Sequence, residues 1–249
     1  MNKRQTEILK YLKKQKFFRT SDLAKKFNYS ESTIRRDLAV LENLHLIKRV
    51  SGGAIVIDDD FIENPTELKY FVNSFEKNKI ADLALDYIAD YHSIFLDSSS
   101  TCQYLGHLLQ EKKHLTIFTT NLSTADLIDK GNISHSLYMI GGQVSNGKVS
   151  GSITEKFMRD IEVDIAFISC KGVSSDYTIS EVLETEALFK KIVRQHAKKV
   201  ILVADHSKIN RSYLFKSLSL SDIDCFITDK QLPQDFVTYL EENNIDYLF

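Results

Sequence analysis

The sequence is poor in the residues that build disulfide-rich or metal-binding chains. It has three cysteines, Cys102, Cys170 and Cys225, at wide spacing and with no CxxC pair. An odd number of widely spaced cysteines argues against a disulfide framework, so we expect buried free thiols in a reducing compartment. No His/Cys cluster has the spacing of a metal site, and the sequence predicts neither a metal nor a cofactor.

Proline, glycine and long apolar runs are also scarce. Two prolines and nine glycines in 249 residues leave little room for disordered segments. No apolar run approaches the ~20 residues that span a bilayer, and the start MNKRQTEILKYLKK is too polar for a secretory signal. We therefore expect a cytoplasmic chain with no membrane partner. Its length leaves room for a small domain and a larger one.

Charge is divided unevenly along the chain. Residues 1–57 hold 13 lysines and arginines against 5 aspartates and glutamates, whereas the remainder holds 19 against 29. We call residues 1–57 the basic head. Such a basic segment in a chain of formal net charge −2 is typical of a protein that contacts nucleic acid at one end. The alternative is a small solvated helical domain with an accidental charge excess.

The basic head contains the pattern of a DNA-reading helix. In SESTIRRDLAVLE, the apolar residues Ile34, Leu38 and Leu41 recur at helical spacing, which leaves Arg35 and Arg36 on the opposite face. Arginine can bond a phosphate, or the acceptor edge of guanine, through two parallel hydrogen bonds. This helix therefore has a core face and a face suited to the major groove.

The segment that follows reads as a strand, a glycine turn and a second strand. Two shorter helical patterns precede the DNA-reading helix, so residues 1–57 predict a winged helix-turn-helix. The candidate DNA-binding residues lie on the helix and on the wing; they are Ser30, Ser32, Thr33, Arg35, Arg36, Lys48, Arg49, Ser51, Gly52 and Gly53.

Three successive acids, Asp58-Asp59-Asp60, favour a linker over residues 58–65. From residue 66 onward helical and apolar strand patterns alternate. Helices are expected over 66–91, from 101 to 112, from 121 to 129, and over 152–159, 181–198 and 233–243. Strands are expected over 93–96, 115–119, 137–140, 164–168, 200–204 and 225–228. This order predicts a Rossmann-like α/β domain over 66–249, with a parallel sheet and helices on both faces.

Small polar residues follow several of these strands. Asp97-Ser98-Ser99-Ser100-Thr101 and Thr119-Thr120-Asn121 each precede a helix, whose free N–H groups and dipole favour an anion. Lys208, after the 200–204 strand, can supply a cation. Together these predict a phosphate-bearing small ligand at the carboxyl ends of the strands. Taken singly, a Ser/Thr cluster before a helix is more often a plain helix cap, and Lys208 alone is more often a solvated lysine.

These motifs resemble the DeoR/GlpR-type bacterial transcription regulators over nearly the whole chain. STIRRDLAVLE followed by LIKRVSGGA is similar to that family's helix-turn-helix signature. LDSSST, TTNLSTAD, MIGG, DIAFISCKGV, ETEALFKKIV, LVADHSKIN and DCFITD occur in the family's order. The resemblance implies a C-terminal domain similar to the sugar-phosphate isomerase and acyl-CoA transferase fold. It also implies that this domain senses a phosphorylated sugar and does not catalyse a reaction.

The resemblance also implies a set of effector-binding positions. They are Asp97, Ser98, Ser99, Ser100, Thr101, Thr120, Asn121, Gly141, Gly142, Lys171 and Lys208, with Glu186 and Lys190 as further pocket positions. The phosphate loop of the family usually reads Asp-x-Gly-Thr-Thr, so Ser99 adds a Cβ where the backbone of the family has none. The loop either binds phosphate with an altered preference or has lost it. Asp176-Tyr177-Thr178-Ile179 also lacks the glycine that usually follows CKGV.

The leading hypothesis is therefore a DNA-binding regulator. We expect a repressor of a sugar-utilisation operon that works as a dimer or tetramer and is relieved by a phosphorylated sugar. One alternative is an isomerase-like or CoA-transferase-like enzyme with an appended DNA-binding domain, although the Asp-Gly-Ala-Asp-Glu pattern of the isomerase is not found. The other is a regulator that is insensitive to ligand.

Overall fold

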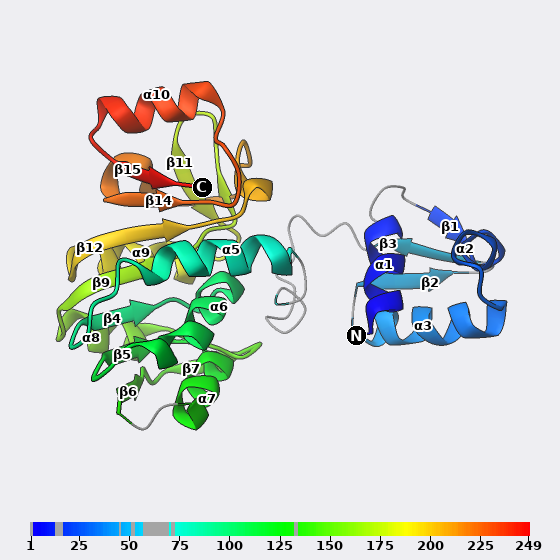
Figure 1. Cartoon of the computed structure of the whole chain (residues 1–249), viewed down its shortest axis with the longest axis horizontal. Coiled ribbons are helices and arrows are strands. Elements are labelled where there is room, and N and C mark those ends of the chain that lie inside the picture. Colours follow the sequence, from blue (N-terminus) through cyan, green and yellow to red (C-terminus); the bar gives the residue numbers. More distant parts are fainter. Residues whose placement is uncertain are drawn as a thin grey trace. The chain divides into compact units, whose positions relative to one another are not determined.

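The computed structural model describes residues 2–12, 17–44, 46–50, 53–56, 70, 73–131 and 134–249. Contacts divide the chain into two compact units, Met1–Asn64 and Pro65–Phe249 (Figure 1). The expected linker, 58–65, lies outside the described residues. Within the described parts, no helix is long and apolar enough to cross a membrane.

The N-terminal unit consists of three helices and a small antiparallel sheet. The helices are α1 (Lys3–Leu12), α2 (Thr20–Phe27) and α3 (Glu31–Asn43), and the strands are β1 (Phe17–Arg19), β2 (Ile47–Val50) and β3 (Gly53–Val56). The apolar stripe of α3, Ile34, Leu38 and Leu41, is buried as the helical spacing predicts. Strands β2 and β3 form the expected wing. The third strand, β1, pairs with β3 and was not predicted.

The C-terminal unit is built on a seven-stranded parallel sheet. Its strands are β4 (Ser93–Leu96), β5 (Thr116–Thr119), β6 (Ser136–Met139), β9 (Val163–Ile168), β12 (Ala197–Val203), β14 (Cys225–Ile227) and β15 (Asp246–Leu248). They lie in the order β15-β14-β12-β9-β4-β5-β6, and every neighbouring pair is parallel. This confirms the predicted α/β architecture. The central strands β4, β9 and β12 contain mostly buried apolar runs because both faces of the sheet are covered there.

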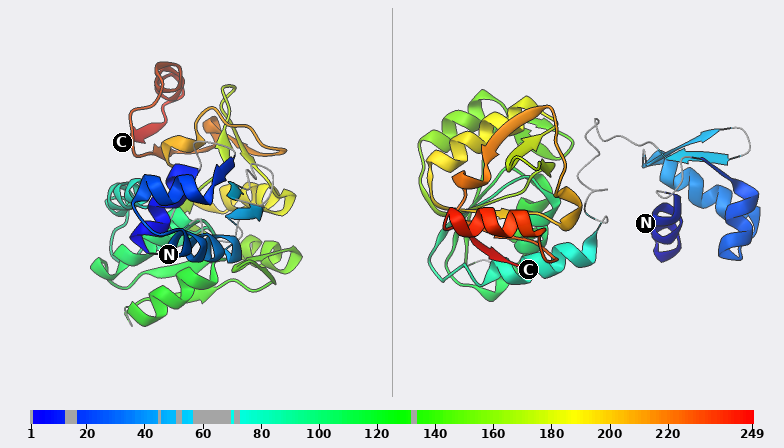
Figure 2. Two further views of the ribbon diagram at one scale, coloured as in Figure 1. Left: turned by 90° about the vertical axis from the view of Figure 1, so that its right-hand side faces the viewer. Right: turned by 90° about the horizontal axis from the view of Figure 1, so that it is seen from above.

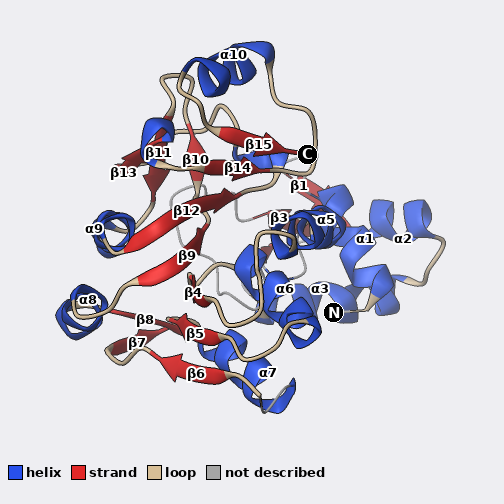
Figure 3. Cartoon of the chain, turned by 60° about the vertical axis from the view of Figure 1, so that its left-hand side comes forward, coloured by secondary structure: helices blue, strands red, loops and turns tan. Residues whose placement is uncertain are grey.

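Helices cover the two faces of this sheet in separate layers (Figure 2 and Figure 3). One hydrophobic core joins Ile94 and Leu96 of β4 to α5 (Ser74–Leu85), α6 (Ser100–Leu108) and α7 (Leu122–Gly131). The other joins Phe95 to α8 (Ser152–Arg159), α9 (Glu184–Gln195) and α10 (Gln234–Glu242). Successive side chains of a strand point to opposite faces, which explains why neighbours in sequence belong to different cores.

A smaller antiparallel sheet lies beside the parallel one. It contains β10 (Gly172–Val173), β11 (Thr178–Glu181) and β13 (Phe215–Ser219). A separate hairpin is formed by β7 (Gln143–Ser145) and β8 (Lys148–Ser150), and the short 3₁₀ helices are η1 (Leu109–Glu111), η2 (His206–Lys208) and η3 (Leu220–Asp222). None of these strands was predicted, because they are short and rich in polar residues.

Two helix predictions were too long. The helix expected over 66–91 ends at Leu85, because the chain turns before β4 and Tyr91 has a φ of 66°. The helix expected over 181–198 runs from Glu184 to Gln195, because Glu181 is paired within β11 and residues from Ala197 onward belong to β12. In the first place a turn, and in the second strand pairing, ends a segment that has the apolar spacing of a helix.

Candidate functional site

The first candidate site is the exposed face of α3 and its N-terminus. Ser30 caps the helix, because its hydroxyl accepts the backbone N–H of Thr33 at 3.2 Å. The Ser30 hydroxyl also lies 2.8 Å from that of Ser32 and 2.9 Å from that of Thr33. These three polar side chains are therefore gathered at the helix start.

The two arginines of α3 differ in what they contact. Arg35 forms an ion pair with Glu31 one turn earlier, at 3.0 Å. Arg36 is exposed, and among the residues that the structure describes nothing pairs with it. An exposed i,i+4 ion pair is worth only a few tenths of a kcal/mol. Both guanidinium groups are therefore available to a phosphate or a base edge.

The wing candidates are only partly described. In the antiparallel pair, Lys48 lies opposite Ile55 and Arg49 opposite Ala54, and Gly53 opens β3. Ser51 and Gly52 lie outside the described residues. The backbone of β2 and β3 thus forms the expected antiparallel pair.

A buried ionic anchor holds α3 against α1. Asp37 is 2 % exposed; its carboxylate accepts the Nε–H of Arg4 at 2.6 Å and the amide of Gln5 at 3.0 Å. The guanidinium of Arg4 also lies 4.8 Å from the centroid of the Tyr29 ring. This anchor orients the helix that carries the arginines. Sequence reasoning missed it, because its partners are more than thirty residues apart.

The second candidate site lies at the carboxyl ends of the parallel strands, where Asp97 joins two of them. One carboxylate oxygen accepts the N–H of Ser99 at 2.7 Å, and the other accepts the N–H of Ser169, after β9, at 2.7 Å. Asn121, after β5, is buried and donates its amide to the carbonyl of Ser98 at 3.0 Å. The ends of β4, β5 and β9 are thereby tied together around the loop 97–101.

This loop leads directly into α6. Ser99 caps the helix and accepts the N–H of Cys102 at 3.1 Å. A helix leaves its first N–H groups without intrahelical partners, so those of Ser100 and Thr101 remain for a ligand. Ser99 has a φ of −80°, which any residue adopts. The serine that stands in place of the family's glycine therefore fits this loop without backbone strain.

A buried cation lies behind the loop. Lys190 of α9 is 7 % exposed, and its ammonium contacts the carboxylate of Glu181 and lies 3.9 Å from Asp97. Burial raises the pKa of Glu181 even beside this lysine. Burial also opposes the charge of Lys190, but the carboxylates of Glu181 and Asp97 outweigh it and raise the pKa of Lys190. The cation is thus held charged by its two acids.

A second ion pair borders this one. Lys148 of β8 contacts the carboxylate of Glu186, and both side chains are largely buried. Sequence reasoning placed Glu186 and Lys190 in the pocket but missed Lys148 and the pairing of Glu181 with Lys190. No sequence signal could identify these pairs, because α9 meets β8 and β11 only through the tertiary fold.

Lys208 approaches the same region from another strand end. Lys208 lies on η2, three residues after Asp205. Burial tends to raise the pKa of Asp205. The charge of Lys208 and hydrogen bonds from Ser207 outweigh burial, so the pKa of Asp205 is lowered. The ammonium groups of Lys190 and Lys208 both act on the buried thiol of Cys170, whose pKa is raised mainly by burial. Lys190, 3.9 Å from Asp97, and Lys208, which follows β12, therefore both lie at the carboxyl ends of the parallel strands.

The remaining pocket candidates have other contacts. Lys171 donates its backbone N–H to Ser180, and its ammonium lies 6.0 Å from the centroid of the Tyr213 ring. The buried Thr120 accepts the N–H of Val149 at 2.8 Å through its carbonyl. Thr120 and Lys171 thus help to join neighbouring segments around the strand ends.

The glycine pair after β6 is tightly packed. A Cβ on Gly142 would lie 2.1 Å from the hydroxyl of Thr154 and 2.7 Å from the carbonyl of Ser150. Gly141 accepts a hydrogen bond from the same Thr154 hydroxyl at 2.9 Å. Close packing against β8 and α8 is thus a sufficient reason for glycine at position 142.

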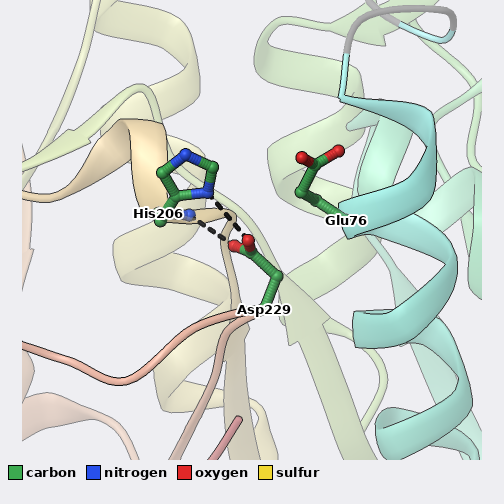
Figure 4. Close-up of side chains that lie close together, drawn as sticks. All are labelled: Glu76, His206 and Asp229. Atoms are coloured by element: carbon green, nitrogen blue, oxygen red, sulfur yellow. Dashed lines mark hydrogen bonds and ion pairs between the residues drawn. The ribbon is translucent and has the colours of Figure 1, made fainter.

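A separate cluster of Glu76, His206 and Asp229 lies where α5 meets the ends of β12 and β14 (Figure 4). One potential ligand atom from each residue lies within 4.8 Å of the others. However, His206 Nδ1 bonds Asp229 at 2.7 Å, and its Nε2 accepts from Lys230 at 3.1 Å. A lysine beside the imidazole opposes a divalent cation. We therefore interpret the cluster as a hydrogen-bonded joint and assign no metal to it.

Comparison with known proteins identifies the family of each part of the chain. A family model described as a DeoR-like helix-turn-helix domain matches residues 4–60, and one described as the DeoR C terminal sensor domain matches residues 72–230. The chain is 32% identical to the HTH-type transcriptional repressor GlcR of Bacillus subtilis, over 97% of this chain and 93% of that protein. It is 28% identical to the glycerol-3-phosphate regulon repressor of Escherichia coli, over 97% of this chain and 96% of that protein.

Solved structures show a weaker likeness. Ribose 5-phosphate isomerase A of Methanocaldococcus jannaschii aligns with 55% of this chain and 55% of its own, at 19% identity and a TM-score of 0.40. We draw no conclusion about chemistry from a likeness at this level.

Proposed function

The chain belongs to the DeoR family of transcriptional regulators, and we propose that it represses a carbohydrate operon until a phosphorylated sugar binds its sensor domain. Its helix-turn-helix domain binds DNA and its C-terminal domain senses a small molecule. The similarity to a glycerol-3-phosphate regulon repressor and to GlcR supports the finer assignment. In this proposal residues 1–57 bind DNA, 58–65 link the domains, and 66–249 sense the effector and oligomerise.

The proposed DNA contacts are the polar face of α3 and the wing. Arg35 and Arg36 would enter the major groove, while the hydroxyls of Ser30, Ser32 and Thr33 bond phosphates or base edges at the helix start. Lys48, Arg49 and the 51–53 turn would contact the adjacent backbone. Because repressors of this kind read paired half-sites, we propose that at least two copies bind each operator.

The proposed effector site is the loop 97–101 together with Lys208. The observation that carries it is that α6 begins after β4 and η2, with Lys208, follows β12 of the same parallel sheet, so both lie at the carboxyl ends of the strands, with Lys190 3.9 Å from Asp97. Lys190 is already neutralised by two carboxylates. Lys208 and the N–H groups of Ser100 and Thr101 are therefore the groups left to bind a phosphate dianion. The sugar would lie among Asn121, Lys171 and the adjoining strand ends.

A thermal-stability screen tests this proposal. The full chain is heated with glycerol 3-phosphate and a panel of hexose and pentose phosphates, each beside its unphosphorylated parent. A ligand at about 100 times its dissociation constant adds about 2.7 kcal/mol to the native state, which raises the midpoint by roughly 5–10 °C. Lys208→Ala should abolish the shift, whereas Lys156→Ala, on the exposed face of α8, should preserve it. An unchanged midpoint with every phosphosugar would favour the ligand-insensitive regulator.

We propose no catalytic activity. Isomerisation or CoA transfer needs a carboxylate that is free to act as base or nucleophile. Glu181 and Glu186 are engaged with lysines, and Asp97 accepts two backbone N–H groups. Turnover of ribose 5-phosphate by the purified protein would contradict this assignment.

A further inference from the structure

The chain enters the sensor domain through a short segment that contacts both sides of the candidate effector site. We call Tyr70 together with Asn73–Lys79 the entry segment; it comprises the described residues that follow the proposed linker. The covalent path from the DNA-binding unit reaches the sensor unit through this segment. A shift of this segment would therefore shift the point at which the chain enters the sensor unit.

The first contact is with α6, the helix that begins at the loop 97–101. The rings of Tyr70 and Tyr104 stack with centroids 4.5 Å apart and planes inclined by 8°. The Tyr104 hydroxyl donates to the backbone carbonyl of Tyr70 at 3.0 Å, and the Tyr70 hydroxyl shares a 2.9 Å hydrogen bond with His107. Side chain and backbone of Tyr70 are thus both fixed to this helix.

The second contact is with the loop that carries Lys208. The amide of Asn73 donates to the carboxylate of Asp205 at 3.0 Å and reaches the Ser207 hydroxyl at 3.4 Å. Asp205 is 1 % exposed, and Lys77, which is also buried, interacts with its charge. Asn73 has a φ of 53°, a left-handed conformation that asparagine adopts more readily than most residues.

The same segment has a third contact, at the end of β14. Lys79 donates to the carbonyl of Asp229 at 2.9 Å, beside the joint formed by Glu76, His206 and Asp229 (Figure 4). The joint also ties His206, the neighbour of Asp205, to this strand end. The entry segment is thus attached on one side to α6 and on the other to the loops after β12 and β14.

We propose that the entry segment is the transmission element that couples effector occupancy to DNA binding; this rests on the proposed function. A phosphate held between the N-terminus of α6 and Lys208 would draw these two elements together. The segment is bonded to both elements, so it cannot keep all its contacts unchanged when their spacing changes. The point at which the chain leaves toward the DNA-binding unit moves with it. Asn73 and Tyr104 are then positioning residues for regulation and do not contact the ligand.

The first test needs no ligand. Hydrogen exchange of the full chain is compared for Asn73→Gly and Asn244→Gly, both of which replace an asparagine at positive φ with a residue that tolerates it. Losing the Asn73 amide should speed exchange at residues 205–208 about fivefold. Asn244→Gly, beyond α10, should leave that loop unchanged. Equal exchange at 205–208 in both variants would overturn the proposal.

The second test measures coupling. DNA affinity is determined with and without the phosphosugar that stabilises the parent protein most, for the parent, Asn73→Gly and Tyr104→Phe. The parent ratio should fall in the usual range of about 5–150-fold, and both variants should reduce it severalfold while still binding DNA and still showing the thermal shift. Tyr247→Phe, which removes a hydroxyl bonded to Glu241, is the matched control and should keep the parent ratio.

The outcomes separate the two proposals. If the parent responds to no phosphosugar, the proposed function fails, and the transmission role that rests on it fails with it. If the parent responds and both variants keep its full ratio, the proposed function stands and the transmission role is refuted.

Discussion

Replacing Lys190 with methionine should leave the buried carboxylate of Glu181 without its neutralising partner. Methionine keeps the apolar stem of the side chain but removes the ammonium that contacts Glu181 and lies 3.9 Å from Asp97. Asp97 retains two backbone donors, so it is the less affected of the two acids. Glu181, 2 % exposed, loses the neutralising charge. Breaking a buried pair in this way typically costs about 3–5 kcal/mol.

The cost should depend on pH, because Glu181 can take up a proton instead of remaining charged. Its pKa is raised by burial and rises further without the lysine. Protonating a glutamate whose unfolded pKa is about 4.3 costs about 4 kcal/mol at pH 7 and about 1 kcal/mol at pH 5. A raised folded pKa means that the lost stability appears as pH rises above the unfolded value. The parent shares part of this pH dependence because its Glu181 pKa is already raised. The variant should therefore lose more stability relative to the parent at pH 7 than at pH 5.

Urea unfolding of the full chain at pH 5 and pH 7, followed by circular dichroism, measures this difference on the transition of the sensor unit. Lys191→Met, on the exposed side of α9, is the matched control and should change stability little. Adding Glu181→Gln to Lys190→Met should recover most of the loss at pH 7. Equal destabilisation at both pH values, or no recovery in the double variant, would refute the reasoning.

Three further substitutions probe other parts of the molecule. Arg36→Ala should weaken operator binding by about 1–3 kcal/mol in fluorescence anisotropy if the side chain contacts a base, and an unchanged affinity would remove it from the interface. Asp37→Ala should lower the thermal midpoint of the N-terminal unit by leaving Arg4 and Gln5 without their acceptor, a loss of about 1–3 kcal/mol. Gly142→Ala should destabilise the sensor unit by about 1–3 kcal/mol because its Cβ meets Thr154 and Ser150, whereas Gly131→Ala, with open space around it, should not.

The central strands of the sensor unit were predictable because each is a run of apolar residues that can be recognised in the sequence without knowledge of its partners. The expected strand 93–96 coincides with β4, and the expected helix 152–159 coincides with α8. The hairpin β7–β8 and the sheet β10-β11-β13 were not predictable, since their strands have two to five residues and contain many polar side chains. Such strands form where distant segments meet, as β11 does with β13.

The sequence predicted the local features of the candidate sites but not the ion pairs that depend on tertiary packing. Ser30 as a cap and the arginine face of α3 follow from local spacing and cap chemistry. The pairing of Lys190 with Glu181 and of Lys148 with Glu186 does not, because these contacts depend on how α9 packs. Ser99 shows what a backbone angle adds. The sequence left open whether serine in place of glycine strains the loop, and a φ of −80° removes backbone strain as an objection.

The order of strands in the sheet has a consequence for how the protein is made. Strands β4 and β9 are neighbours at the centre of the sheet, although about seventy residues separate them in the chain, and β15 closes one edge with nearly the last residues. The N-terminal unit needs only contacts within its first 64 residues. At about 5–20 residues per second of synthesis, that unit emerges roughly 10–40 seconds before the chain can complete its sheet. Each newly made copy thus acquires its DNA-reading helix before it acquires a finished sensor.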